Sequence, residues 1–292
     1  MTFDEQALTF ECEGESLVGI LSGASSPAPR GVLIVVGGPQ YRVGSHRQFA
    51  LLARALAAHG VPAFRFDYRG MGDSSGELRT FERVDADIRC AIDRFFASVP
   101  GLKDIVIWGL CDAASAALFY AHQDARVSGI AVLNPWVRTG QGAARVYLRH
   151  YYVRRLIQPE LWRKIGRGEF SIRQALAGLA RLAIEATGKA PAPGESAAPA
   201  RTAEPSCPEG ALPERMEEGL HRFRGRVLLV LSGNDLTAQE FKDLAAGSRR
   251  WRRLLADERV TRRDLAEANH TFSRREWRDQ IAAWTAQWVR SW

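Results

Sequence analysis

The sequence predicts an α/β fold built on a mostly parallel, doubly wound sheet. The main observation is that short apolar segments suited to buried strands alternate with segments in which apolar residues recur at helical spacing. A second observation is that polar or glycine-rich turns follow several of the apolar segments, at the strand ends where parallel sheets carry their chemistry. The 292 residues are enough for one large domain, or for one domain with an insertion.

The first half of the chain supplies most of the expected sheet. Residues 7–12 and 16–21 predict a hairpin around an acidic, glycine-containing turn. The unbroken apolar run at 32–36 indicates a central strand that is covered on both faces. The remaining elements follow in alternation: a helix at 47–59, a strand at 63–67, a helix at 82–98, a strand that ends at Leu110, and a strand at 129–133.

The second half departs from this alternation between about residues 135 and 224. Residues 136–187 are rich in arginine and aromatic side chains and predict a helical lid. This lid is expected to cover the functional site at the carboxyl ends of the strands and to shape its pocket. Residues 188–213, rich in proline and alanine, have little to bury and predict a flexible linker. The expected core therefore comprises residues 1–135 and 225–292. Its last part holds a strand at 227–231, an edge strand at 259–265, and a helix whose Trp277, Ile281, Trp284 and Trp288 predict a core-packing stripe.

Composition and charge exclude several classes of function. Arginine provides most of the net charge of +7, but no nucleic-acid-binding motif accompanies it, so no nucleic-acid partner is expected. The chain shows no signal peptide and no apolar run of membrane-spanning length, so we expect a cytoplasmic protein without stable membrane insertion. The histidines lack ligand spacing, and neither a metal nor a cofactor is expected. Reduced thiols are expected because no C-x-x-C spacing or paired framework links the four cysteines, Cys12, Cys90, Cys111 and Cys207.

Residues 105–116 carry the most informative motif. A β-favouring apolar run leads into Gly109, which is followed by Cys111 and a series of small residues that suit the start of a helix. This is the pattern of a nucleophile elbow, G-x-S-x-G, with Cys111 in place of serine and Ala113 in place of the last glycine. Small residues are needed because larger side chains would collide in the strand-to-helix turn, and the helix N-terminus favours a thiolate. The alternative is a buried structural cysteine.

Other strand ends carry the partners that a nucleophilic cysteine needs. Asp235 follows the strand at 227–231 and can orient an imidazole, while His270 follows the last strand and can act as a base. A glycine-rich turn ends the strand at 32–36, where a backbone N–H can join that of Asp112 to stabilise an oxyanion. Each feature also has a purely structural interpretation. Asp235 is then a turn or helix-capping residue, His270 a helix-start residue, and the glycine-rich segment an ordinary turn. The order nucleophile, acid, base along the chain favours the catalytic interpretation.

Three blocks, at 37–47, 65–73 and 109–116, together resemble the exosortase A system-associated hydrolase 1 family of the α/β-hydrolase superfamily. That family is associated with bacterial exopolysaccharide and PEP-CTERM protein-sorting gene clusters. The resemblance implies an α/β-hydrolase fold over nearly the whole chain, the lid and linker excepted. The turn at 67–74 also resembles the D-x-R-G-x-G-x-S turn of the superfamily, and we expect Arg69 to fix it.

The resemblance also assigns roles to site residues. Compared with the wider superfamily, cysteine replaces serine at the elbow, Ala113 replaces glycine, and Val36 stands where related oxyanion loops have histidine. Cysteine nucleophiles do occur in this fold, as in the dienelactone hydrolases. The implied roles are nucleophile for Cys111, base for His270, orienting acid for Asp235, and oxyanion donors for the backbone N–H groups of Gly38 and Asp112.

Three basic residues just beyond the oxyanion loop are candidates for binding an anionic part of a substrate: Arg42, His46 and Arg47. A solvated loop that leads into a helix is the equally good alternative for this segment.

These features predict an enzyme that hydrolyses an ester or thioester acyl bond through a Cys–His–Asp triad and a covalent acyl-enzyme. The expected substrate is a small-molecule or carrier-linked acyl compound. One alternative is acyl transfer to an amine or hydroxyl acceptor, because amines attack a thioester more readily, relative to water, than they attack an oxyester. The other alternative is a catalytically idle hydrolase fold that serves as a binding protein.

Overall fold

The computed structural model describes residues 4–23, 28–38, 40–137 and 211–292. The chain divides into two compact units, one comprising Met1–Val137 and Pro213–Trp292 and the other comprising Arg138–Leu212. Of the second unit, only the last two residues are described. The predicted lid and linker therefore lie almost entirely outside the described residues, and both stay predictions.

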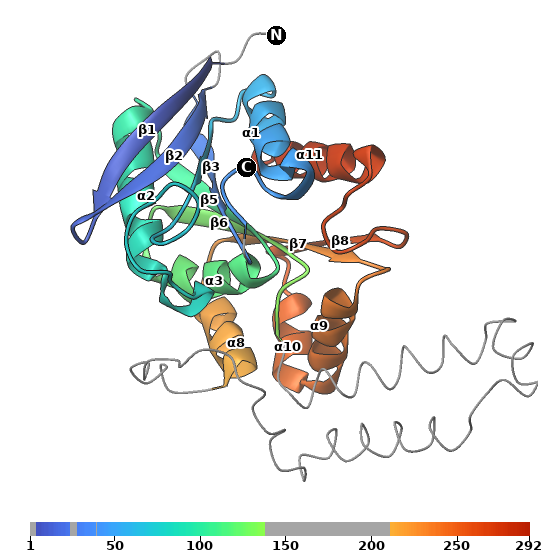
Figure 1. Cartoon of the computed structure of the whole chain (residues 1–292). Helices are drawn as coiled ribbons and strands as arrows, with labels where there is room; N and C mark the ends of the chain where they lie inside the picture. Colours follow the sequence, from blue (N-terminus) through green and yellow to red (C-terminus); the bar gives the residue numbers. More distant parts are fainter. Residues whose placement is uncertain (1–3, 24–27, 39, 138–210) are drawn as a thin grey trace, which may run out of the picture. The chain divides into compact units, whose positions relative to one another are not determined.

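In the described part of the chain, eight strands form one sheet (Figure 1). They are β1 (Asp4–Cys12), β2 (Glu15–Gly23), β3 (Arg30–Val35), β4 (Ala63–Phe66), β5 (Asp104–Leu110), β6 (Val127–Leu133), β7 (Arg226–Ser232) and β8 (Val260–Leu265). Their order across the sheet is β1-β2-β4-β3-β5-β6-β7-β8. Strand β2 pairs antiparallel with β1 and β4, whereas every neighbouring pair from β4 to β8 is parallel. The predicted α/β class with a mostly parallel sheet is confirmed.

The predicted N-terminal hairpin is present as β1 and β2. Glu13 and Gly14 connect these strands with φ angles of 50° and 83°. A two-residue hairpin turn of this kind needs positive φ at both positions, because only then does its twist match that of the strands. The turn pairs Cys12 with Glu15, and the resulting register places Leu17 in the core with no exposed surface.

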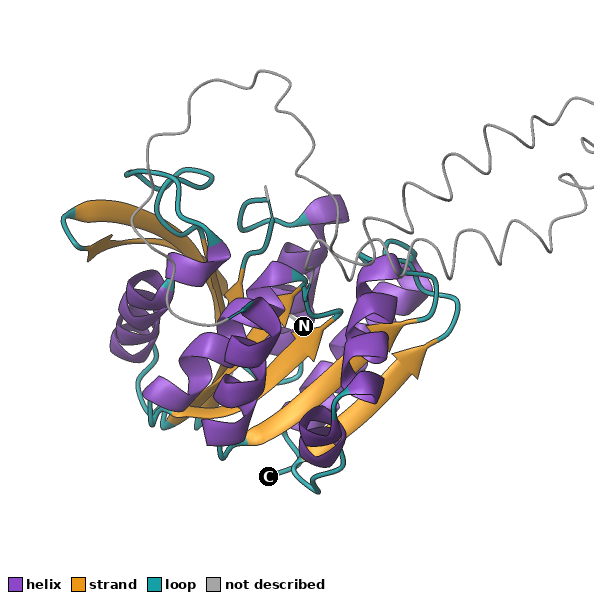
Figure 2. Ribbon diagram, turned by 90° about the horizontal axis from the view of Figure 1, so that it is seen from below, coloured by secondary structure: helices purple, strands orange, loops and turns teal. Residues whose placement is uncertain are grey.

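Helices cover both faces of the sheet. The described α-helices are α1 (Gln48–Ala58), α2 (Asp85–Ser98), α3 (Asp112–Tyr120), α8 (Leu212–Arg222), α9 (Leu236–Gly247), α10 (Arg249–Leu255) and α11 (Arg275–Val289). Helices α1 and α11 contact each other on one face, and α3, α9 and α10 lie on the other (Figure 1). Figure 2 shows the second group from below, with the strands behind it. The doubly wound arrangement is therefore confirmed.

The central strands form the most deeply buried part of this unit. The side chains at positions 32–35 of β3 have no exposed surface, because helices cover both faces of the sheet there. On α11, Ile281 and Trp288 are 4% and 7% exposed, so the predicted core packing is confirmed at these two positions. Trp277 and Trp284 are only half-buried.

Helices α8, α9 and α10 are absent from the sequence prediction. The position of α8 depends on Gly219, where an added Cβ would lie 2.0 Å from the carbonyl oxygen of Leu118 on α3. Glycine in a helix interior lowers helix propensity. Gly219 therefore lets α8 approach α3 and, for the same reason, makes this helix harder to predict from helix propensity. Helix α9 begins directly after Asp235, for which the sequence offers a helix-capping role as an alternative but no helix bounds.

Candidate active site

Cys111 occupies the turn between β5 and α3. Its backbone has φ 63° and ψ −123°, a conformation that is rare for residues other than glycine. Such strain persists only where the surrounding structure enforces it, and here a buried strand runs directly into a helix. A Cβ at Gly109 would lie 2.5 Å from the carbonyl group of Ala113. The tight turn therefore requires glycine at this position, for the reason that the elbow motif predicts.

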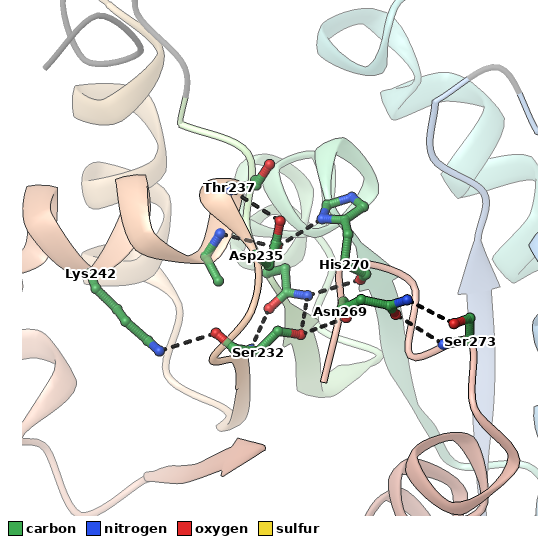
Figure 3. A network of polar contacts seen from close by, with 9 residues as sticks. Ser232, Asp235, Thr237, Lys242, Asn269, His270 and Ser273 are labelled. Carbon is green, nitrogen blue, oxygen red and sulfur yellow. Dashed lines mark hydrogen bonds and ion pairs between the residues drawn. The ribbon is translucent and has the colours of Figure 1, made fainter. Parts of the chain in front are cut away.

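Asp235 and His270 form the hydrogen-bonded pair in Figure 3. His270 Nδ1 lies 2.8 Å from Asp235 Oδ2. The aspartate side chain also caps α9, accepting hydrogen bonds from the backbone N–H groups of Thr237 at 3.2 Å and Ala238 at 3.1 Å. The capping role and the orienting role, which the sequence presents as alternatives, are thus compatible. The cap holds the carboxylate in one position, 7% exposed, beneath the imidazole.

The Cys111 side chain lies close enough to the imidazole of His270 to raise its pKa. Burial lowers the pKa of His270, but its hydrogen bond to Asp235, the nearby Cys111 and the charges of both groups together raise that pKa to about 10. An imidazole with such a pKa carries a proton at neutral pH. The chain of contacts from carboxylate to imidazole to sulfur therefore favours an imidazolium next to the cysteine.

The amide of Gly38, one of the two expected to stabilise an oxyanion, lies beside the elbow, but a side chain already occupies it. The N–H of Gly38 donates a hydrogen bond to Asp112 Oδ2 at 2.8 Å. The other carboxylate oxygen of Asp112 accepts a hydrogen bond from the N–H of Ala113 at 2.9 Å. In the free protein, the group bound by the N–H groups of Gly38 and Ala113 is thus the carboxylate of Asp112, the residue that follows Cys111.

The three candidate substrate-binding residues lie in different environments. The guanidinium of Arg42 forms ion pairs with the buried Asp67 and with Asp73, so carboxylates of the fold already compensate its charge. His46 and Arg47 are exposed, and both have positive φ, 52° and 59°. A role for these residues in binding substrate stays a prediction.

The turn at 67–74 holds in place the segment just beyond the oxyanion loop. Asp67 Oδ1 accepts a hydrogen bond from the backbone N–H of Arg42 at 2.5 Å, and Oδ2 accepts one from the N–H of Asp73 at 3.1 Å. The guanidinium of Arg69 pairs with the fully buried Asp87 at 2.8 Å. Arg69 therefore fixes this turn, as the sequence predicts.

A sequence model described as the Alpha/beta hydrolase family matches residues 32–284. The chain belongs to the alpha/beta hydrolase family. The fold implied by the sequence resemblance is thereby confirmed at the level of this broad family. No curated protein matches the chain significantly.

Solved structures of an esterase and of an esterase domain have a similar fold. An esterase of Pyrococcus furiosus superposes with a TM-score of 0.65 at 13% identity, covering 99% of this chain and 92% of that chain. The esterase domain of a Rhodothermus marinus protein superposes with a TM-score of 0.57 at 16% identity, covering 98% of each chain. At these identities, the likeness establishes the fold alone.

In this alpha/beta hydrolase, a buried polar network positions the histidine loop, which is the segment that carries Asn269 and His270. The sequence pattern does not identify the residues of this network as part of the site. The amide nitrogen of Asn134 donates to the Ser232 hydroxyl at 2.8 Å and to the backbone carbonyl of His270 at 3.0 Å. The Ser232 hydroxyl donates to the carbonyl of Asn269 at 2.9 Å (Figure 3). Asn134 directly follows β6 and is fully buried with φ 43°. A polar residue at the carboxyl end of a central strand was the signal that could have identified it.

Within the described ranges, no group of three or more histidine, cysteine or carboxylate side chains is arranged to hold a metal ion. Among the same residues, no helix is both long and apolar enough to cross a membrane.

Proposed function

We propose that this alpha/beta hydrolase cleaves an ester or thioester acyl bond, with Cys111 as nucleophile, His270 as acid and base, and Asp235 as the orienting carboxylate. The observation that carries the proposal is the unbroken series of contacts from Asp235 through His270 to Cys111 at a strained strand-to-helix turn. A structural cysteine would need neither the strained backbone nor an imidazole paired with a buried carboxylate.

In the proposed acylation step, the sulfur of Cys111 attacks the carbonyl carbon of the substrate. A carbon–sulfur bond forms, and the π electrons of the carbonyl move onto its oxygen. When this intermediate collapses, the bond to the leaving group breaks, and that group takes a proton from His270. Asp235 stabilises the imidazolium and holds the tautomer that directs the other ring nitrogen toward sulfur.

In the proposed second step, His270 removes a proton from water, which attacks the thioester carbonyl. The carbon–sulfur bond then breaks, the acid leaves, and the Cys111 sulfur is free for another cycle. Both solved structures compared above are named as an esterase or an esterase domain, which supports acyl-ester chemistry in this fold. The resemblance of three sequence blocks to the exosortase A system-associated hydrolase 1 family supports a substrate from exopolysaccharide-linked metabolism.

Acyl transfer is the second candidate function, and the sulfur of Cys111 favours it. A thioester acyl-enzyme reacts with amines more readily, relative to water, than an oxyester does. An amine or hydroxyl acceptor would then replace water in the second step, with His270 again removing the proton.

A panel of ester and thioester substrates tests this proposal, using the wild-type protein with Cys111→Ala and Cys111→Ser. We expect thioesters and activated esters to be cleaved, Cys111→Ala to lose turnover, and the acyl group to be found on Cys111 by mass spectrometry. Turnover that survives in Cys111→Ala would exclude this nucleophile. A folded wild-type protein that a thiol-directed probe fails to label at Cys111 would favour the binding-protein alternative.

A further inference from the structure

The carboxylate of Asp112 lies where an alpha/beta hydrolase would hold the oxyanion of its substrate. Its two oxygens accept hydrogen bonds from the N–H groups of Gly38 at 2.8 Å and Ala113 at 2.9 Å. The backbone N–H of Asp112 also interacts favourably with its own carboxylate. Of the two amides that were expected to bind an oxyanion, that of Gly38 is thus already occupied by this side chain.

The surrounding backbone leaves space for this carboxylate. A Cβ at Gly37 would lie 2.3 Å from Asp112 Oδ1 and 2.7 Å from the carbonyl oxygen of Leu110. Gly37 does not have positive φ, so its conformation does not call for glycine. The absence of a side chain at position 37 therefore serves close packing, and one of the groups it admits is the Asp112 carboxylate.

The charges around Asp112 matter because an oxyanion would have the same sign. Burial raises the pKa of Asp112 by more than the N–H groups around it and the charge of His270 lower it, so its pKa lies above the usual value for aspartate. Tyr68 lies near enough that Asp112 raises the pKa of its phenol, after the larger effect of burial. The Asp112 carboxylate and a substrate oxyanion therefore compete for the N–H of Gly38.

We propose that the Asp112 side chain fills the oxyanion hole of the free enzyme and acts as a specificity-determining residue, admitting only acyl groups whose carbonyl oxygen displaces it. This inference rests on the proposed function, because it assigns Asp112 a role in acylation of Cys111. The displaced carboxylate stays next to the acyl carbonyl, being attached to the residue after the nucleophile. Substrates that are neutral or positively charged beside the carbonyl are therefore preferred over substrates with an anionic group there.

Alkylation of Cys111 by iodoacetate and iodoacetamide tests the charge selection without requiring turnover. The two reagents transfer similar groups to sulfur with loss of iodide, but only iodoacetate carries a negative charge. We expect Asp112→Asn to raise the ratio of the iodoacetate rate to the iodoacetamide rate by roughly tenfold, because it removes the adjacent charge and keeps the shape of the side chain. Asp85→Asn is the matched control, since Asp85 also lies in the first turn of a helix, α2. It should leave the ratio unchanged.

The Gly38 amide reports directly on occupation of the hole, whether or not the protein is an enzyme. In protein labelled with ¹⁵N-glycine, we expect Asp112→Ala to shift the Gly38 amide proton upfield, because the hydrogen bond to the carboxylate is lost. Adding butyraldehyde should move the resonance again, as the Cys111 sulfur bonds to the aldehyde carbon and the resulting oxygen takes the vacated place. The aldehyde should also bind Asp112→Ala more tightly than the wild-type protein.

Failure of the proposed function and failure of this inference give different results. Absence of ester turnover with a Gly38 resonance that responds to Asp112→Ala would refute the reaction and retain the occupied hole. An unchanged Gly38 resonance in Asp112→Ala, or an unchanged alkylation ratio in a folded Asp112→Asn protein, would overturn the inference.

Discussion

Oδ2 of Asp235 lies 2.8 Å from Nδ1 of His270 and 3.1 Å from the backbone nitrogen of Ala238. One oxygen therefore orients the imidazole and caps helix α9. This double role couples the stability of α9 to the geometry of the site, and variants that keep one role and remove the other can separate them.

We expect Asp235→Asn to keep the cap and to impair the chemistry. Both variants lose the ion pair with the His270 imidazolium, but asparagine is as good an N-cap as aspartate, so Asp235→Ala should be less stable than Asp235→Asn by about 1 kcal/mol. Both variants should lower kcat/KM by roughly 10²- to 10⁴-fold, because the imidazolium loses its carboxylate partner. Urea unfolding and steady-state kinetics check these outcomes. Equal stability of the two variants, or full turnover by Asp235→Asn, would contradict the double role.

The pKa of His270 predicts how its contribution to stability varies with pH. Burial lowers this pKa, but Asp235 and Cys111 raise it to about 10, above the value of about 6.5 for an unfolded chain. The stabilisation is therefore fully present below about pH 6.5 and is lost as the pH rises through about 10. The difference in unfolding free energy between wild type and His270→Gln should be largest near pH 6 and should shrink toward pH 10. A difference that grows with pH would show that folding lowers the pKa of His270 instead of raising it.

Asn134 should matter for both stability and turnover. Asn134→Ala leaves Ser232 and the carbonyl of His270 without their partner, and we expect a loss of about 1–3 kcal/mol. Asn134→Gly removes the side-chain amide without adding backbone strain, because glycine tolerates the φ of 43° and alanine does not. Comparing the two variants therefore separates the effect of the lost amide from the effect of strain. Glycine should be the more stable of the two variants, and both should lower kcat more than they raise KM. Wild-type kcat in both would exclude a positioning role.

Arg42 should primarily stabilise the segment just beyond the oxyanion loop. Arg42→Ala leaves the fully buried Asp67 without its guanidinium partner, which should cost about 3 kcal/mol. The exposed Arg47 is the control, since Arg47→Ala should change stability by less than about 0.5 kcal/mol. A KM that rises in Arg42→Ala for anionic esters, but not for neutral ones, would instead support the substrate-binding role predicted from the sequence.

The parts of this site that could be predicted are those with a local signature. The elbow at Gly109 and Cys111 follows from short-range sterics, and Asp235 and His270 follow from their positions after strands in a parallel sheet. The N-terminal hairpin and the edge strand β8 were predictable for the same reason, since residue alternation and turn chemistry are local.

The parts that could not be predicted depend on contacts between distant segments. Asn134 reaches Ser232 and His270 only because β6, β7 and the histidine loop meet in the fold. The Asp112 carboxylate reaches Gly38 only because β3 and β5 are neighbours. In the sequence, Asp112 is one more polar residue at a helix start, and only its backbone N–H entered the predicted site.

The rate of Cys111 alkylation as a function of pH tests the central claim most directly, with wild type and His270→Ala compared by mass spectrometry of the Cys111 peptide. If the cysteine forms a reactive pair with His270, wild type should react near its full rate at pH 7, and the rate in His270→Ala should rise only near pH 8.5, as for an ordinary free thiol. Two coincident profiles with that ordinary midpoint would contradict the triad and leave Cys111 a structural residue.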